Sequence, residues 1–261
     1  MIKYKKSLGQ NFLIDKNVLD IIVNSTQIKD KEVLEIGPGS GNLTQYILEK
    51  SPKKLFVVEK DDNLRKNLLE KFSEEISFAG EDILKIEEQK ITKNKLTVFG
   101  NLPYNISTEI IIKWINSLTD MIWFDVLVLM FQKEVADRIL ANHDTSNYGR
   151  LSILANWKLD IKKIIDIKPS SFIPKPKVDS SLLIFYPKKT FFKIKDSKNL
   201  EKITRVFFSQ RRKMLKKPFN LIFNNHLNIA EKLGIDLNLR PQNLTPEMYF
   251  KITKEFEQLR S

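Results

Sequence analysis

A glycine-rich turn lies between a short apolar run and a stretch of helical periodicity, and it reads Glu35-Ile-Gly-Pro-Gly-Ser-Gly41. The run before it, residues 33–37, indicates a buried strand, and residues 43–50 repeat apolar side chains at helical spacing. Glycines let the backbone turn sharply and approach a ligand closely, because they carry no side chain that would collide with it. The turn therefore predicts a nucleotide-type cofactor at a strand-to-helix junction of an α/β fold.

The alternation of strand and helix continues beyond this turn. Further strands are predicted at 55–59, 76–79, 96–100 and 124–131, and further helices at 61–72 and 107–117. Strands that alternate with helices form a mostly parallel sheet covered by helices on both faces. The predicted fold class is therefore α/β, with a Rossmann-like, doubly wound domain.

The pattern changes near residue 190. A Pro-rich loop at 168–177 is expected to lack regular structure, and it leads into a last strand at 178–187. From about residue 197 onward only helices are predicted. We therefore expect an α/β domain at residues 1–190 and a small all-helical domain at residues 191–261.

Basic charge is concentrated in one segment of the chain. The 261 residues include 44 Lys and Arg against 32 Asp and Glu, which gives a net charge of +12. Residues 188–217 hold 12 basic and 2 acidic side chains, whereas residues 1–187 hold 27 and 25. A compositional bias would spread the excess along the chain. We therefore interpret the segment as a patch that attracts the phosphate backbone of a nucleic acid.

Composition excludes several classes of protein. The chain has no Cys, so a disulfide scaffold is excluded, and its two His residues, His143 and His226, are interpreted as non-catalytic. We therefore expect no metal site. No apolar run approaches the roughly 20 residues that span a bilayer, and the basic N-terminus lacks the apolar segment of a signal peptide. These features favour a cytoplasmic protein without membrane association.

Acidic side chains follow two later strands. Glu59 ends the second strand, where a carboxylate can accept hydrogen bonds from ribose hydroxyls. The glycines fall as G-x-G-x-G and not as the dinucleotide fingerprint G-x-G-x-x-G, and this resembles the first motif of S-adenosylmethionine-dependent methyltransferases. In that superfamily the acid after the third strand, here Asp82, often contacts the adenine amino group. Asp82 could equally be a helix cap, and the sequence leaves both roles open.

A polar tetrapeptide, Asn101-Leu-Pro-Tyr104, follows the fourth strand, at the sheet edge where ligands bind in this architecture. By itself it could be an ordinary turn. It resembles the motif of enzymes that methylate exocyclic amino groups, and Leu102 gives it the form found in ribosomal RNA adenine N6 dimethyltransferases. A DNA adenine methyltransferase is less favoured, because it usually has Pro at that position.

The resemblance to this family extends from residue 8 to about residue 213. It is carried, in the family's order, by Leu8–Leu13, Asn101–Thr108, Tyr148–Ser152, Phe172–Ser180 and Phe207–Lys213. It implies S-adenosyl-L-methionine as the cofactor. The cofactor-binding residues that it implies, together with the glycine turn, are Gln10, Asn11, Leu13, Glu35, Gly37, Gly39, Gly41, Glu59, Asp82 and Asn101.

The catalytic residues expected from this resemblance are Asn101, Leu102, Pro103, Tyr104 and Phe172. The N6 amine of adenine is a poor nucleophile, because its lone pair is delocalised into the ring. The Asn101 side-chain carbonyl and the backbone carbonyl of Leu102 or Pro103 would grip its hydrogens and favour a pyramidal nitrogen. Tyr104 and Phe172 would sandwich the base and stabilise the developing positive charge. Phe172 could instead be a plug of the hydrophobic core.

The resemblance further implies dimethylation of two adjacent adenosines in the hairpin loop near the 3′ end of small-subunit (16S) rRNA. The partner would be that RNA within the small ribosomal subunit or its precursor, contacted by Arg211, Arg212, Lys213, Lys216 and Lys217, and the enzyme is expected to act as a monomer. Three alternatives stay open: the large-subunit (23S) rRNA branch that confers macrolide resistance, a non-catalytic RNA-binding assembly factor, and, against the glycine spacing, a dinucleotide oxidoreductase.

Overall fold

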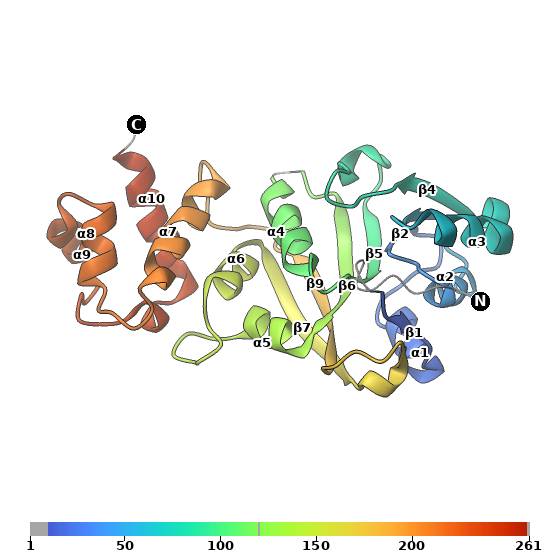
Figure 1. Cartoon of the computed structure of the whole chain (residues 1–261). Helices are drawn as coiled ribbons and strands as arrows, with labels where there is room; N and C mark the ends of the chain where they lie inside the picture. The colour runs from blue at the N-terminus through green and yellow to red at the C-terminus, as the bar shows by residue number, and fades with distance from the viewer. Residues whose placement is uncertain (1–9, 120, 260–261) are drawn as a thin grey trace. The chain divides into compact units, whose positions relative to one another are not determined.

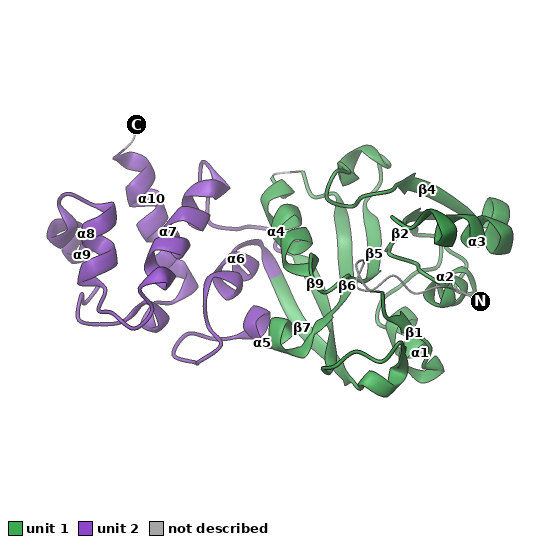
Figure 2. Ribbon diagram, viewed as in Figure 1, with its two compact units in different colours: residues 1–136, 160–187 green, residues 137–159, 188–261 purple. Residues whose placement is uncertain are grey.

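The computed structural model describes residues 10–119 and 121–259, and the chain divides into two compact units (Figures 1 and 2). Unit 1 contains residues to 136 and 160–187, and unit 2 contains 137–159 and the residues from 188. The division after 187 lies close to the expected domain boundary. Residues 137–159, which the sequence analysis placed in the first domain, cluster with the helical unit, because α6 (Arg150–Lys158) contacts its helices.

Unit 1 is built on a seven-stranded sheet with the strand order β4-β3-β2-β5-β6-β9-β7. Its strands are β2 (Glu32–Ile36), β3 (Lys54–Val58), β4 (Ile76–Gly80), β5 (Leu96–Asn101), β6 (Phe124–Gln132), β7 (Leu159–Ile167) and β9 (Ser180–Pro187). Neighbours from β4 to β6 pair in parallel, and β9 pairs antiparallel with β6. The predicted mostly parallel sheet is therefore confirmed.

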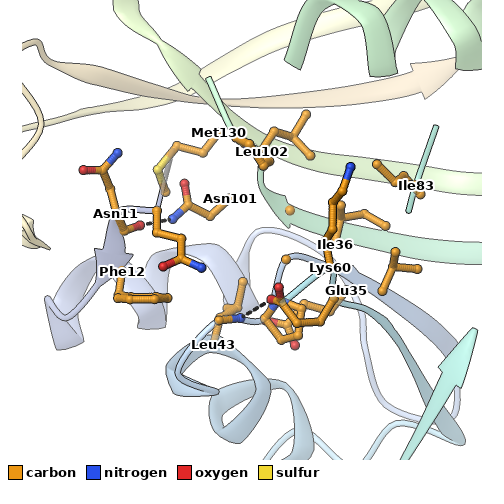
Figure 3. A pocket seen from close by; sticks show the side chains of 18 of the residues that line it. Asn11, Phe12, Glu35, Ile36, Leu43, Lys60, Ile83, Asn101, Leu102 and Met130 are labelled. Carbon is orange, nitrogen blue, oxygen red and sulfur yellow. Dashed lines mark hydrogen bonds between the residues drawn. The ribbon is translucent and has the colours of Figure 1, made fainter. Parts of the chain in front are cut away.

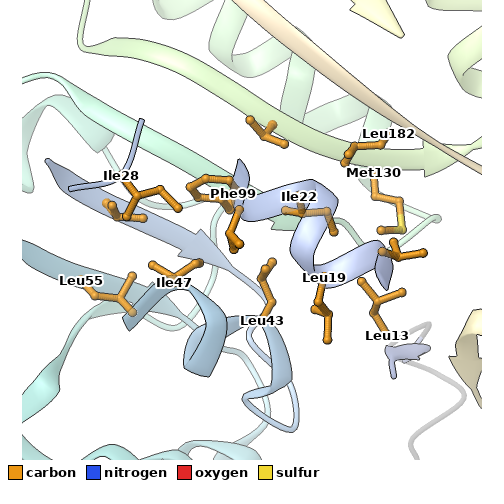
Figure 4. Close-up of a cluster of buried hydrophobic side chains, with 14 of the residues drawn as sticks. Leu13, Leu19, Ile22, Ile28, Leu43, Ile47, Leu55, Phe99, Met130 and Leu182 are labelled. Carbon is orange, nitrogen blue, oxygen red and sulfur yellow. The ribbon is translucent and has the colours of Figure 1, made fainter. Parts of the chain in front are cut away.

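Successive side chains of a strand point to opposite faces of the sheet, and in this unit both faces are buried. On one face Val33, Leu55 and Val57 join a hydrophobic cluster that includes residues of three helices, which span 16–24, 42–48 and 62–72 (Figure 4). Leu34 and Phe56, which alternate with them, are buried as well. The helices of this unit are α1 (Lys16–Asn24), α2 (Asn42–Leu48), α3 (Asp62–Phe72), α4 (Ser107–Ser117) and the first half of α5 (Lys133–Leu140).

A separate two-stranded sheet joins β1 (Phe12–Leu13) to β8 (Phe172–Ile173). The strands run antiparallel, with Leu13 opposite Phe172. The Pro-rich loop at 168–177 was expected to lack regular structure, so β8 corrects that prediction. Its strand geometry depends on a partner far away in the sequence, which local periodicity cannot detect.

Unit 2 is helical, as predicted. Its helices are α6, α7 (Ser197–Ser209), α8 (Lys216–Ile222), α9 (His226–Leu233) and α10 (Pro246–Gln258). Its core contains Phe207, whose ring meets those of Phe219 and Tyr249 edge to face at centroid distances of 5.3 and 5.6 Å. In the described part of the chain no helix combines the length and apolar character that crossing a membrane would require.

Candidate active site

A cavity of about 260 Å³ opens in unit 1 at the carboxyl ends of β2, β3 and β5 (Figure 3). Five short stretches of chain line most of it: residues 10–13, 35–40, 58–60, 81–84 and 100–106. Ligands of doubly wound sheets bind at this edge. The cavity therefore brings together the glycine turn, the acids after two neighbouring strands and the Asn-Leu-Pro-Tyr loop.

The glycine turn depends on backbone angles that other residues rarely adopt. Gly37, Gly39 and Gly41 have φ angles of +66°, +59° and +83°. A Cβ atom on Gly39 would lie 2.5 Å from the ring of Phe12, so the N-terminal motif can pack on the turn only because position 39 has no side chain. Gly41 ends the turn as the N-cap of α2 and does not line the cavity.

Two buried carboxyl groups line the cavity beside this turn. Glu35 is 1% exposed and accepts a hydrogen bond of 2.7 Å from the Thr44 hydroxyl; its burial, and secondarily the charge of Glu59, raise its pKa to about 8. Glu59 accepts hydrogen bonds from the backbone N–H of Gly39 (3.1 Å) and of Asp61 (2.8 Å), and burial raises its pKa as well. Two desolvated acids suit a ligand that carries positive charge and hydroxyl groups. S-adenosylmethionine has both.

Asp82 lines the cavity from the segment after β4. Its Oδ1 accepts from the backbone N–H of Leu84 (3.1 Å), and its Oδ2 accepts from the Lys60 ammonium (2.9 Å). The hydrogen bond from Lys60 lowers the pKa of Asp82. The capping bond that the sequence left open therefore exists, although within a turn. A carboxylate oxygen can accept more than one hydrogen bond, so Asp82 can still receive an adenine amino group.

The side chain of Asn101 is oriented by the N-terminal motif. Its amide nitrogen donates a hydrogen bond of 2.8 Å to the backbone carbonyl of Asn11, as Figure 3 shows. The Asn101 carbonyl oxygen accepts no hydrogen bond from the residues that the structure describes. Because the nitrogen is held, this oxygen is the group that a donor in the cavity would meet.

The neighbouring catalytic candidates also line the cavity. Leu102 is 1% exposed and, with Pro103, forms the turn between β5 and α4. The Tyr104 hydroxyl hydrogen bonds with the Ser180 hydroxyl at 2.6 Å, and burial raises the pKa of Tyr104. The tyrosine is therefore neutral and held at its hydroxyl end by the first residue of β9.

Phe172 is not brought into the cavity. It is fully buried, belongs to the hydrophobic cluster of unit 1 and is absent from the cavity wall. As the first residue of β8 it pairs with Leu13, and this pairing directs its ring into the core. The core role that the sequence left open for Phe172 is the one that the structure supports, and the predicted stacking role is withdrawn.

Residues 10–13 of the N-terminal motif make hydrogen bonds near the glycine turn and to the catalytic loop. Gln10 donates to Asp61 (3.1 Å), and the carbonyl of Leu13 accepts from the Asn42 amide (2.7 Å). With the bond from Asn101 to Asn11, residues 10–13 connect the glycine turn to the catalytic loop. Leu8 and Gly9 of the motif lie outside the described residues.

The five predicted RNA-binding residues all belong to unit 2, but their surroundings differ. Arg211 donates to the Gln242 side chain (3.4 Å) and to the backbone carbonyls of Thr145 (3.3 Å) and Ser146 (2.5 Å). The exposed residues Arg212, Lys213, Lys216 and Lys217 instead line a hollow of about 550 Å³, together with Met214, Asn220, His226 and Arg240. Only these four of the five are free to face an anionic partner.

Sequence reasoning missed three residues of the active site. Lys60 pairs with Asp82, Ser180 holds Tyr104, and Asn42 holds the N-terminal motif. Lys60 could have been suspected, since it directly follows Glu59 at a strand end. Ser180 ends the Phe172–Ser180 motif, but its bond to Tyr104, like the bond from Asn42 to Leu13, joins residues far apart in the sequence, and no local pattern signals either contact.

A mostly parallel sheet whose carboxyl edge combines a glycine turn with a loop suited to an exocyclic amine is the arrangement of S-adenosylmethionine-dependent methyltransferases. Within that class, a model described as "Ribosomal RNA adenine dimethylase" matches residues 1–258. The chain belongs to this family, and the predicted cofactor, S-adenosylmethionine, is confirmed.

Individual relatives agree with this assignment. A Pelagibacter ubique (strain HTCC1062) protein named ribosomal RNA small subunit methyltransferase A is 68% identical over 259 residues, 99% of either chain. The crystal structure of a dimethyladenosine transferase from Plasmodium falciparum has a TM-score of 0.80 at 29% identity and covers 95% of this chain and 98% of that one. The 23S rRNA methyltransferase ErmE has a TM-score of 0.69 at 21% identity, covering 95% and 100%. At that identity the likeness shows the fold alone.

Proposed function

We propose that this protein transfers methyl groups to N6 of two adjacent adenosines near the 3′ end of small-subunit (16S) rRNA, in a hairpin loop, and so forms N6,N6-dimethyladenosines. Membership of the adenine dimethylase family supports the reaction. The name of the 68% identical relative supports the small subunit over the large-subunit alternative. When bound, S-adenosyl-L-methionine supplies the methyl group.

The orientation of Asn101 is the observation that carries this proposal. Its amide nitrogen is engaged by Asn11, so its carbonyl oxygen is presented to a hydrogen-bond donor in the cavity. The N6 amine of adenine is such a donor, and the second acceptor is the backbone carbonyl of Leu102 or that of Pro103, which already accepts from the Ile106 N–H (3.1 Å). Gripping both hydrogens localises the nitrogen lone pair and makes the amine nucleophilic. No strong general base is needed, because the nitrogen becomes acidic once it is alkylated.

Tyr104 is proposed to stack on the target base. Its hydroxyl is hydrogen bonded to the Ser180 hydroxyl, and this bond limits movement of the ring. Stacking of an aromatic side chain on a base contributes about 1–3 kcal/mol. An adenine within a duplex could not reach the cavity, so the target must be single-stranded or flipped out.

The remaining roles concern the cofactor and the RNA. We assign Glu59 to the ribose hydroxyls and Asp82 to the adenine amino group, because both carboxylates line the cavity. We assign the contact with the rRNA backbone to Arg212, Lys213, Lys216 and Lys217, because these exposed cations line one hollow. The partner is the small ribosomal subunit or its precursor. We further propose that the protein acts as a monomer in the cytoplasm and needs no metal ion.

Asn101→Ala tests the proposed chemistry. The assay incubates undermethylated small subunits with cofactor labelled in its methyl group and maps the modified nucleotides. We expect the variant to lose on the order of 10²–10³-fold in turnover, as when one positioned polar group is removed from an active site. Its dissociation constant for S-adenosylmethionine should change far less, rising by at most about tenfold, since Asn101 is only one of the residues that line the cofactor cavity.

Two results would contradict the proposal. Turnover of Asn101→Ala at the rate of the unmodified protein would remove the amine-gripping role. In a parallel incubation of the unmodified protein with large subunits, label in their rRNA, together with none in small-subunit rRNA, would assign the protein to the other branch of the family.

A further inference from the structure

Lys113 joins two walls of the cavity without itself lining it. It lies on α4, and its ammonium donates three hydrogen bonds to the segment between β4 and β5. The acceptors are the backbone carbonyls of Ile83 (2.7 Å) and Ile86 (2.5 Å) and the Oε1 of Glu88 (2.5 Å). An ammonium has three donors, so these contacts use all of its capacity.

Glu88, the acidic partner, is buried within this cluster. It is 3% exposed, and the same Oε1 also accepts a hydrogen bond of 2.6 Å from the indole nitrogen of Trp114. Trp114 is 1% exposed and meets Trp123 edge to face at 5.7 Å. Two neighbouring residues of α4 therefore hold one buried carboxylate, and this fixes residues 83–88 to the helix.

Both parts joined by Lys113 continue directly into the cavity wall. Residues 81–84 contribute Asp82 and Ile83 to it. Residues 100–106 form the catalytic loop and lead straight into the first turn of α4, where the Ile110 N–H donates to the Ile106 carbonyl (3.0 Å). The Ile83 carbonyl is therefore connected to the catalytic loop through the Lys113 side chain and about two turns of α4.

We infer that Lys113 is a positioning residue for methyl transfer, which sets the spacing between the wall carrying Asp82 and the loop carrying Asn101. The inference rests on the proposed roles of these two residues. Transfer requires the amine and the methyl donor to be aligned, and a displacement of about 1 Å can cost on the order of 10²-fold in rate. Side chains that lock the supporting segments keep such a site in register.

Three variants test this role. Lys113→Met removes the three hydrogen bonds and leaves the buried Glu88 carboxylate without its cation, which also destabilises the fold. The double variant Lys113→Met/Glu88→Gln removes that unpaired charge while the segment stays released. Lys90→Met is the matched control, because Lys90 is an exposed lysine of the same segment that pairs with Glu87 on the surface.

The measurements are made on the full chain at a temperature well below its unfolding midpoint. In both Lys113 variants we expect the dissociation constant for S-adenosylmethionine to rise by about three- to tenfold and kcat to fall by on the order of tenfold or more. Hydrogen exchange of the cofactor-free protein should accelerate at residues 83–88 and 101–106, while β2 and β3 keep their protection. Lys90→Met should match the unmodified protein in every measurement.

A purely structural role would give another pattern. If both Lys113 variants bind cofactor and turn over normally, and only the melting temperature of Lys113→Met falls, the inference is overturned. Cofactor binding and hydrogen exchange need no RNA. A wrong rRNA assignment would therefore leave this test intact, and a failed test would leave the rRNA assignment standing.

Discussion

At the scale of single residues, burial decides how the cavity presents its polar groups. Glu35 accepts a hydrogen bond from the Thr44 hydroxyl and shares its surroundings with a second carboxyl group, Glu59. Desolvation favours the neutral form of an acid, so the folded protein holds a proton on Glu35 that an unfolded chain would release. A cationic cofactor in the same cavity would reverse that preference, and this makes Glu35 suited to a site that binds a sulfonium.

The proton on Glu35 predicts a pH dependence of stability. The pKa is 4.5 in an unfolded chain and about 8 in the folded protein, so the folded state binds more protons between these values. Stability contributed by this group is therefore fully present below about pH 4.5 and is lost as the pH rises towards 8. Glu35→Gln, which cannot ionise, should flatten the dependence and unfold at higher urea than the unmodified protein at pH 8.

Urea unfolding of the cofactor-free protein at intervals from pH 5 to pH 8.5 measures this difference. Asp166, whose pKa is lowered to about 2 chiefly by the Ser181 hydroxyl, titrates well below this range and does not interfere. Parallel pH profiles for Glu35→Gln and the unmodified protein would show that Glu35 is ionised when folded, contrary to the prediction.

The predicted site residues that the structure brings to the cavity wall share one property. Glu35, Glu59, Asp82 and Asn101 lie at or just beyond the carboxyl ends of neighbouring parallel strands, and these ends meet at one edge of the sheet whatever the details of packing. The position of the Phe172 side chain cannot be predicted in this way. Its position depends on a pairing with Leu13 across most of the chain, and nothing near it in the sequence specifies that partner.

At the scale of elements, the segment 142–148 is held to the rest of unit 2 by contacts with residues 211 and 242–244. Arg211 reaches two of its backbone carbonyls, and the Tyr148 hydroxyl donates to the Leu244 carbonyl (2.9 Å). The sequence placed this segment in the first domain because the chain had not yet passed the predicted boundary. Such membership is decided by long-range packing, whereas strands such as β5 and β6 were predictable from their own apolar runs.

Arg211→Ala should therefore destabilise the protein. It removes three hydrogen bonds from a charged donor, and because Thr145 and Ser146 are exposed and water can replace the donor, the free energy of unfolding should fall by about 1 kcal/mol. Arg212→Ala is the matched control, because the neighbouring side chain is exposed, and a change within about 0.5 kcal/mol is expected. Chemical denaturation followed by circular dichroism compares the two. Equal stabilities would mean that the Arg211 contacts contribute nothing in solution.

At the scale of the whole molecule, charge and chemistry occupy different parts of the chain. Residues 1–187 are nearly neutral and contain every residue that lines the cavity, whereas the excess charge falls within residues 188–217. Under the proposed roles, this division would separate recognition of a base, which needs shape and hydrogen bonds, from affinity for folded RNA, which needs phosphate contacts. The two tasks can therefore be impaired independently by mutation.

Replacement of Arg212, Lys213, Lys216 and Lys217 by Gln should weaken binding to small subunits and flatten its salt dependence. Each lost phosphate contact reduces the slope of log K against log salt by about one, because fewer counterions are released. Binding titrations from 50 to 200 mM salt, which are about the range where such effects are large, measure the slope. Affinity for S-adenosylmethionine should not change. A control with four exposed lysines of unit 1 replaced by Gln (Lys29, Lys53, Lys90 and Lys93) alters net charge equally. If both quadruple variants shift the slope by the same amount, net charge alone attracts the RNA and the hollow in unit 2 has no special role.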